Sequence, residues 1–197
     1  MLASLLLTFL LVLLNGFFVA AEFGLVKVRA SQLDILIQKG SSRAKVARTL
    51  LEKLDAYLSA TQLGITLASL ALGAIGEETI SHIVISLFQK YDLGVSMITV
   101  HSISLPIALT MLTFFHVTLG EQIPKMIGIK YSMDTALFIA WPLKIFYTVF
   151  SPFIWLLNKS SNIILRIVGI KKIGEEEVHT EEELRLIHLD QNLKTFM

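Results

Sequence analysis

Long apolar runs separated by polar stretches predict a chain of membrane-spanning helices. Leu2 to Val26 contains one charged side chain, Glu22, whereas Tyr57 to Gly76 and Leu93 to Leu119 contain no Asp, Glu, Lys or Arg. Each run is long enough for a helix to cross a hydrocarbon core of about 30 Å, and Pro106 predicts a kink in the third. A cleaved signal peptide is the alternative for the first run, but it would have a basic start and a shorter apolar core.

Basic side chains gather in the connection between the first two runs. Seven of them follow the first run closely: Lys27, Arg29, Lys39, Arg43, Lys45, Arg48 and Lys53. Cytoplasmic connections are rich in Lys and Arg, so we expect this connection inside and the N-terminus outside. Leucine and isoleucine at helical spacing from Gln32 to Leu54 predict a juxtamembrane helix along the inner leaflet, with a solvated linker as the alternative.

The stretch after the second run is mildly acidic, as expected of an outer loop. It contains Glu77, Glu78, Lys90 and Asp92, and Thr79 to Gln89 predicts a short interfacial helix. The second run is expected to cross from inside to outside. The third run is also long enough to span, so it is expected to cross back inward.

Tyr131 to Asn158 is apolar enough to span but contains Asp134, Pro142, Lys144 and Pro152. A fourth crossing would place the basic residues that follow it outside, against the charge rule. Two short helices in a re-entrant hairpin, with Pro142 and Lys144 near the turn, would keep both ends inside. We therefore favour an all-α membrane protein with three transmembrane helices, a re-entrant helical hairpin and a juxtamembrane helical belt.

The composition becomes acidic near the end of the chain. Thr180 followed by Glu183 is a capping-box pattern, which opens a soluble, charged helix. We expect a transmembrane domain over residues 1–170, and in residues 171–197 the start of an acidic linker to a further cytoplasmic domain, with the C-terminus cytoplasmic.

Composition narrows the functional classes. The 197 residues are 54% hydrophobic and 17% charged, with a net charge of +1, so we expect the lipid bilayer as a partner and no nucleic acid. The chain has no cysteine, which excludes disulfides and thiolate chemistry. It contains no GxSxG or P-loop motif, so we do not expect an enzyme.

The stretch TLGEQIPK, Thr118 to Lys125, is the strongest candidate for chemistry. Pro124 has no N–H and leaves the Gly120 carbonyl without its helical donor. With the Glu121 carboxylate beside it, this carbonyl forms a ligand set suited to a hard cation such as Mg²⁺ or Na⁺. The alternative is a solvated Glu121 paired with Lys125, after which Pro124 only ends the helix.

Other polar residues are expected near the same cytoplasmic face. Glu22 is predicted at a depth that matches Glu121, together with hydroxyl and amide groups in the first turns of the second apolar run: Ser59, Thr61, Gln62 and Thr66. His101 and His116 are expected to be hydrogen-bonded between helices, with metal ligation as the alternative. Small residues from Ala60 to Gly76 predict close helix packing, and since three crossings make a thin bundle, we expect a homodimer.

Four segments of the chain together resemble the transmembrane domain of the CNNM/CorC family, which is often described as hemolysin-like. They are LNGFFVAAEFGLVKVR (Leu14 to Arg29), LSATQLGITLASLALG (Leu58 to Gly73), TFFHVTLGEQIPK (Thr113 to Lys125) and SPFIWLLNKSSNIILRIVG (Ser151 to Gly169). HTEEELRLI, His179 to Ile187, resembles the start of the linker to the CBS-pair region of that family.

The resemblance implies a homodimer that exports Mg²⁺, driven by Na⁺ entry, from a cytoplasm-facing cavity at Glu121. A membrane-anchored Mg²⁺ sensor that regulates another transporter is the alternative. Many relatives have serines where this chain has Val19 and Ala21, and an Asn-Asn pair where it has Thr61 and Gln62. These departures leave the ion preference of this chain open. The expected metal ligands are Glu121, the Gly120 carbonyl, Thr61, Gln62, Thr66 and Ser69. Glu22 is expected to join the site or to hold the helices in register by pairing with Lys27 or Lys125.

Overall fold

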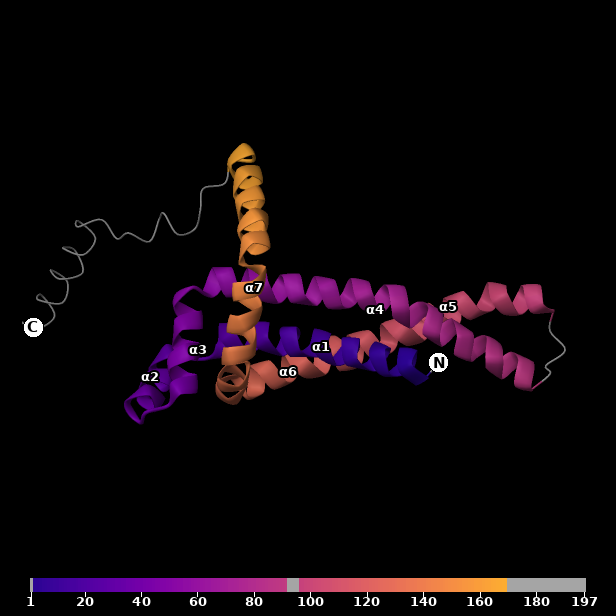
Figure 1. The fold of residues 1–197 in the computed structure, drawn as a ribbon, viewed down its shortest axis with the longest axis horizontal. Helices are drawn as coiled ribbons and strands as arrows, with labels where there is room; N and C mark the ends of the chain where they lie inside the picture. Colours follow the sequence, from indigo (N-terminus) through magenta and orange to yellow (C-terminus); the bar gives the residue numbers. More distant parts are fainter. Residues whose placement is uncertain (1, 92–95, 170–197) are drawn as a thin grey trace, which may run out of the picture. The chain divides into compact units, whose positions relative to one another are not determined.

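A computed structural model describes residues 2–91 and 96–169, and within these residues every regular element is a helix (Figure 1). The expected linker, residues 171–197, and the side chain of His101 lie outside the described part. The chain divides into two compact units, Met1–Ile154 and Trp155–Met197. The candidate functional site described below lies in the first unit.

The helices follow one another with short connections. In order they are α1 (Leu2–Lys27), α2 (Ala30–Gln38), α3 (Ser42–Glu52), α4 (Leu54–Lys90), α5 (Met97–Phe115), the π-helical turn η1 (His116–Gln122), α6 (Ile123–Lys130) and α7 (Ser132–Ile167). Four stretches are long and apolar enough to cross a membrane: α1, α4, the continuous segment Ile98–Lys130, and α7. By length and composition, these helices are typical of a multi-pass membrane protein.

The first three apolar runs form one bundle in which α4 is antiparallel to its neighbours. Ser69 of α4 is hydrogen-bonded to Asn15 of α1, whereas Gly64, earlier in α4, lies against the later residue Phe18. α1 and the α5–α6 segment run parallel, and α6 approaches α1 through small residues. A Cβ on Gly128 would lie 2.6 Å from the Ala20 carbonyl oxygen, so the two backbones are in direct contact there.

α4 is longer than expected. The sequence predicted a crossing that ends at Gly76 and a separate interfacial helix over Thr79 to Gln89, but the structure has a single helix that ends at Lys90. Glutamates are good helix formers, so Glu77 and Glu78 do not interrupt the helix. With 37 residues, α4 is about 55 Å long, which exceeds the hydrocarbon thickness of a bilayer.

The predicted juxtamembrane helix is present as two helices, α2 and α3. Gly40 separates them with a φ of +86°, a conformation that favours glycine, and Ser41 caps α3 by accepting a hydrogen bond from the Ala44 N–H. Leu33 and Leu50 are fully buried and belong to the main core, which also includes residues of α1, α4 and α7. The two helices are therefore packed onto the bundle and are not a solvated linker.

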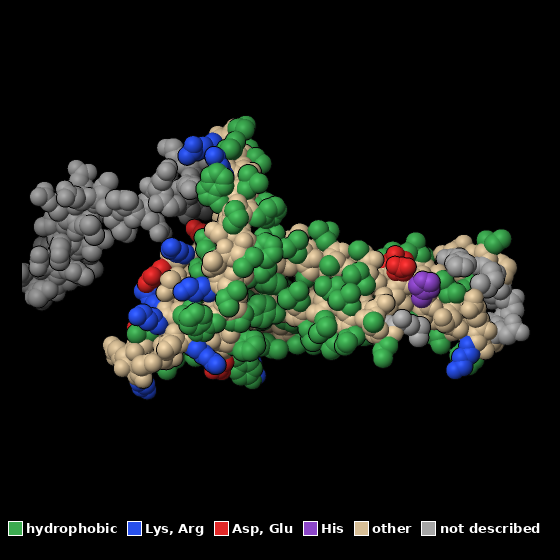
Figure 2. Space-filling view, in the orientation of Figure 1, with side chains coloured by type: hydrophobic (Ala, Val, Ile, Leu, Met, Phe, Trp, Pro, Cys, Tyr) green, Lys and Arg blue, Asp and Glu red, His purple; other side chains and the backbone are tan. Residues whose placement is uncertain are grey.

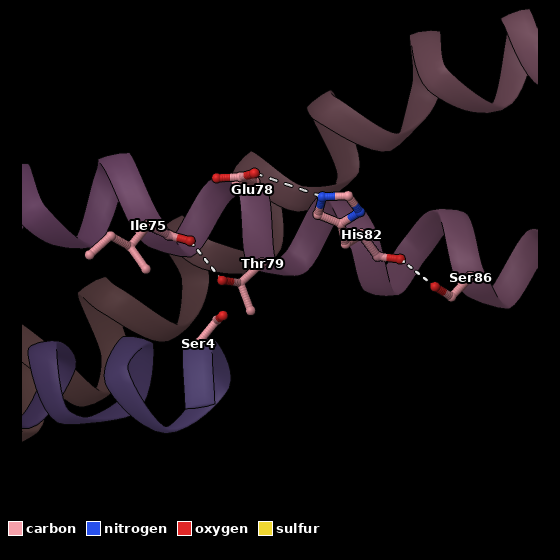
Figure 3. Close-up of a pocket in the computed structure, with 6 residues that line it drawn as sticks. All are labelled: Ser4, Ile75, Glu78, Thr79, His82 and Ser86. Atoms are coloured by element: carbon pink, nitrogen blue, oxygen red, sulfur yellow. Dashed lines mark hydrogen bonds and ion pairs between the residues drawn. The ribbon is translucent and has the colours of Figure 1, made fainter. Parts of the chain in front are cut away.

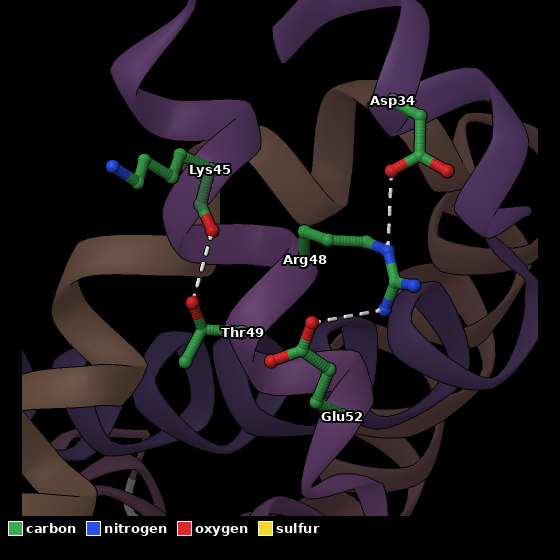
Figure 4. A network of polar contacts seen from close by, with 5 residues as sticks. All are labelled: Asp34, Lys45, Arg48, Thr49 and Glu52. Carbon is green, nitrogen blue, oxygen red and sulfur yellow. Dashed lines mark hydrogen bonds and ion pairs between the residues drawn. The ribbon is translucent and has the colours of Figure 1, made fainter.

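Arg48 of α3 links these helices electrostatically. Its guanidinium lies 3.2 Å from an Asp34 oxygen on α2 and 3.5 Å from a Glu52 oxygen one turn further along α3 (Figure 4). Figure 2 shows Lys and Arg side chains gathered over this end of the bundle, whereas apolar side chains cover its length.

The re-entrant hairpin is not confirmed. α7 is helical through Pro142 and Lys144, where we expected a turn, and Pro152 also lies inside it. Proline lacks a donor, but a helix in an apolar environment tolerates it where neighbouring groups satisfy the freed carbonyls. Since α7 is itself long enough to span, the hairpin stays a prediction.

Candidate functional site

The third membrane helix changes its hydrogen-bonding pattern around TLGEQIPK. α5 passes into the π-helical turn η1, in which the Ile123 N–H donates to the Thr118 carbonyl five residues earlier. A π turn inserts an extra residue into a helix and is frequent at functional sites. Because Pro124 has no N–H, the backbone cannot make the α-helical bond to the Gly120 carbonyl.

Asn15 of α1 supplies the missing donor. Its Nδ2 donates to the Gly120 carbonyl at 2.9 Å, and its Oδ1 accepts a hydrogen bond from the Ser69 hydroxyl at 3.1 Å. The Asn15 side chain is fully buried, and both ends of its amide are bonded. Position 120 is tightly packed, because a Cβ there would lie 3.0 Å from His116 Cδ2 and 3.3 Å from the Asn15 nitrogen, so a larger residue would displace these side chains. One amide thus connects α1, α4 and the π turn.

His116 extends this network to Glu121. Its Nε2 lies 3.4 Å from the Ser69 hydroxyl oxygen and 3.7 Å from a Glu121 carboxylate oxygen. The His116 side chain is 19% exposed and that of Glu121 is 43% exposed, so the carboxylate remains open on one side. The network therefore runs from the Gly120 carbonyl through Asn15, Ser69 and His116 to Glu121.

We expected Glu121 near the end of its helix, and the structure corrects this expectation. The helix continues through η1 and α6 to Lys130, and Gly120 is bonded to Asn15, midway along α1. A proline commonly ends a helix, but here the π turn carries the helix past Pro124. The carboxylate is thus level with the middle of α1.

Glu22 does not share the level of Glu121, which corrects a second expectation. It lies seven residues beyond Asn15, on the same face of α1 and about 10 Å further along the axis. α1 and α6 run parallel with Gly24 next to Gly128, so Glu22 is level with the end of α6. The two carboxylates occupy different levels of the bundle.

Glu22 is instead level with the first turns of α4. It lies one turn beyond Phe18, which packs against Gly64, so the antiparallel register places it at about the level of Thr61 and Gln62. In the part of the chain that the structure describes, Glu22 makes no ion pair, so the expected pairing with Lys27 or Lys125 is absent there.

The polar residues of α4 do not form one cluster. Thr61 is buried and its hydroxyl donates to the Leu58 carbonyl, whereas Thr66 is exposed and donates to the Gln62 carbonyl. Of the four candidate residues on this helix, only Ser69 joins the network at Glu121. Roles of Thr61, Gln62 and Thr66 as ligands stay predictions.

The alternative interpretation of TLGEQIPK predicted an ion pair between Glu121 and Lys125. In the structure Glu121 contacts His116, and the Lys125 ammonium lies 4.9 Å from the centre of the Phe23 ring, in a cation–π contact. Sequence reasoning missed Asn15. A lone amide in an apolar run is nevertheless a signal, because such groups are expected to form hydrogen bonds between helices.

A polar hollow lies at the end of α1 and α4 that is opposite to the helices α2 and α3. It has a volume of about 450 Å³ and is lined by Ser4, Ile75, Glu78, Thr79, His82 and Ser86 (Figure 3). Glu78 and His82 are 3.8 Å apart, one helical turn from each other, and both are largely exposed. This arrangement is that of a solvated helix face. Among the described residues no group of three or more His, Cys, Asp or Glu side chains is placed to hold a metal ion.

Comparison with known proteins agrees with this architecture. The family model described as the Cyclin M transmembrane N-terminal domain, CNNM, matches residues 6–192. UPF0053 protein YhdT of Bacillus subtilis is 43% identical over 192 residues, which are 97% of this chain and 41% of the relative.

Similarity extends to other bacteria. Uncharacterized protein Rv1841c of Mycobacterium tuberculosis is 35% identical over 179 residues, 90% of this chain and 50% of that relative. The chain thus spans half or less of the length of these relatives. With a family match over nearly its whole length and several apolar helices, this multi-pass membrane chain belongs to the CNNM family.

Proposed function

We propose that this chain forms the membrane domain of a divalent-cation exporter, with Glu121 as its anionic ligand and Mg²⁺ as the expected ion. The observation that carries the proposal is a half-exposed carboxylate within a π-helical turn in the middle of a helix bundle. An ionisable side chain at such a level within a membrane protein marks an ion pathway by default.

The surroundings of Glu121 support cation binding. The Ser69 hydroxyl is linked to the carboxylate through His116, and the adjacent residue Gly120 offers a carbonyl oxygen that already accepts one hydrogen bond from Asn15. A carbonyl oxygen has a second lone pair that remains for a cation. Mg²⁺ usually retains several waters, so a site with one carboxylate and few direct ligands is sufficient.

Glu22 suits a separate role on the same route. At the level of Thr61 and Gln62, Glu22 lies between Glu121 and the end of the bundle where the basic helices α2 and α3 pack. The positive-inside rule makes that end cytoplasmic. In the proposal, a cation enters from the cytoplasm past Glu22 and reaches Glu121, and Na⁺ entering from outside drives its export.

Self-association completes the proposal. A three-helix bundle leaves the polar side of α4 uncovered, since Gln62, Thr66 and Gly73 are exposed. Exposed small and polar residues on a membrane helix favour contact with another helix. We expect a homodimer in lipid nanodiscs, which mass photometry of the purified protein tests directly.

Mg²⁺ flux in proteoliposomes tests the proposed transport. We expect Glu121→Gln to lower the flux by tenfold or more, because a lost charge-assisted contact of about 1.5–3 kcal/mol has that effect on binding. Glu78→Gln, a carboxylate at the other end of the bundle that is 75% exposed, is the matched control and should retain flux. Flux measured with and without an inward Na⁺ gradient tests the coupling.

The same assay separates transport from sensing. Absence of flux in wild-type protein that still binds Mg²⁺ through Glu121 would favour the membrane-anchored sensor. Flux that is unchanged in Glu121→Gln would leave this carboxylate as a solvated group and remove the basis of the site.

A further inference from the structure

We infer that His116 is a nitrogen ligand of the cation at Glu121, so that this site binds first-row transition cations such as Mn²⁺ more tightly than Mg²⁺. The inference rests on the proposed function and specifies the ion class of the same site. The His116 imidazole lies 3.7 Å from the Glu121 carboxylate, and a nitrogen ligand is one that an Mg²⁺ site does not need.

The geometry fits one cation between the two side chains. Metal–nitrogen and metal–oxygen bonds are about 2.1 Å long, so two ligands of one ion at ordinary angles are roughly 3.0–3.6 Å apart. His116 Nε2 is 3.7 Å from the Glu121 oxygen and 3.4 Å from the Ser69 oxygen. These separations are close to those of ligands that share an ion.

The hydrogen bonds leave the ligand atoms available. The Ser69 hydroxyl donates its proton to the Asn15 Oδ1, so its oxygen keeps lone pairs for a cation. Asn15 cannot rotate away, because its Nδ2 is bonded to the Gly120 carbonyl. Asn15 is thus a positioning residue, while Glu121, His116 and Ser69 supply a carboxylate, an imidazole and a hydroxyl.

This donor set discriminates between cations. Imidazole nitrogen suits Mn²⁺, Fe²⁺, Co²⁺ and Zn²⁺, whereas Mg²⁺ prefers oxygen ligands and water. A simple ion pair of protonated His116 with Glu121 is the competing interpretation of the same distance. It predicts that no nitrogen coordinates a bound cation, and this difference can be measured.

Electron paramagnetic resonance of Mn²⁺ bound to the whole chain in nanodiscs provides the test. We expect Mn²⁺ to bind about tenfold more tightly than Mg²⁺ in competition, and pulsed measurements to detect ¹⁴N coupling to the bound ion. His116→Gln should abolish that coupling and weaken Mn²⁺ binding by about tenfold or more, while Mg²⁺ affinity changes by less than about twofold. His82→Gln, which alters a histidine in the far hollow, is the control and should change neither.

The outcomes separate this inference from the proposed function. Mn²⁺ that binds through Glu121 without ¹⁴N coupling, or with coupling that persists in His116→Gln, overturns the nitrogen ligand and leaves the cation site intact. Equal affinities for the two ions overturn the preference. Failure of both ions to bind in a Glu121-dependent way removes the site itself. The wild-type coupling decides the question even if His116→Gln does not fold.

Discussion

His116 Nε2 and a Glu121 carboxylate oxygen lie 3.7 Å apart although the two residues are five positions apart along one helix. On an α-helix, residues five apart point about 140° away from each other. The π turn η1 removes this divergence, because its hydrogen bonds join residues five apart. The pairing at the candidate site is therefore a consequence of the backbone between the two residues.

Pro124→Ala tests this dependence on the backbone. Alanine would restore an N–H that can bond to the Gly120 carbonyl, so we expect the π turn to revert to α-helix and His116 to separate from Glu121. Cation binding and flux should fall by about tenfold or more, while the melting temperature stays equal or rises. Isothermal titration with Mg²⁺ and Mn²⁺, together with thermal unfolding, checks both parts.

Pro106→Ala is the matched control, since Pro106 lies inside the α-helical segment α5. It should leave cation binding unchanged. Pro124→Ala protein that unfolds early, or that binds cations as wild type does, would contradict the role given to the π turn.

Asn15→Leu tests the amide that joins three helices. The substitution keeps the size of the side chain but leaves the Gly120 carbonyl without its donor and the Ser69 hydroxyl without its acceptor. We expect the free energy of unfolding to fall by about 1–3 kcal/mol, as for other unsatisfied buried groups. Equilibrium unfolding in mixed micelles measures it.

The control for this variant is Thr8→Val, at another buried polar position of α1. The Thr8 hydroxyl bonds only to the Ser4 carbonyl of its own helix, so its loss should change stability by less than about 0.5 kcal/mol. Similar losses in the two variants would mean that the amide does not join the helices.

The sequence predicted the main helices because their signals are local. Apolar runs located α1 and α4, and leucine and isoleucine at helical spacing located α2 and α3. The predicted end of the third membrane helix was wrong. A proline such as Pro124 predicts a helix end unless a neighbouring helix supplies a donor to the freed carbonyl, here that of Gly120. That donor, Asn15, is more than a hundred residues earlier in the chain.

The candidate site was predictable in part for the same reason. Glu121, Gly120 and Ser69 were found from residue type and position, and the structure brings them near one another. The contact with His116 was missed because α-helical geometry places it on another face. The level of Glu22 was misjudged because depths were counted from helix ends, which sequence patterns locate poorly.

Gly128→Ala tests the contact between α1 and α6. A Cβ at this position would lie 2.6 Å from the Ala20 carbonyl oxygen and 3.1 Å from the Gly24 nitrogen, both backbone atoms that cannot rotate away. We expect a loss of about 1–3 kcal/mol in the free energy of unfolding. Gly73→Ala is the matched control, because a Cβ there meets nothing within 4 Å, and it should be neutral or slightly stabilising. Equal effects of the two substitutions would show that α1 and α6 are not in close contact.

Single cysteines test the orientation of the helices, and the chain suits this approach because it contains none. Lys39→Cys, between α2 and α3, should react with a membrane-impermeant maleimide only after the cytoplasmic side is opened. Tyr91→Cys, after α4, should react in intact cells, because the basic connection is expected inside. Reversed labelling of these two positions would invert the proposed direction of export.

Val168→Cys decides whether α7 crosses the membrane, since Val168 directly follows that helix. A hairpin that returns to the cytoplasm predicts that this cysteine is labelled under the same conditions as Lys39→Cys. We expect that result, because a fourth crossing would place Lys159 and Arg166 on the outer side, against the charge bias of membrane proteins. Labelling in intact cells would instead identify α7 as a fourth crossing, and the cytoplasmic position proposed for the C-terminus would then be wrong.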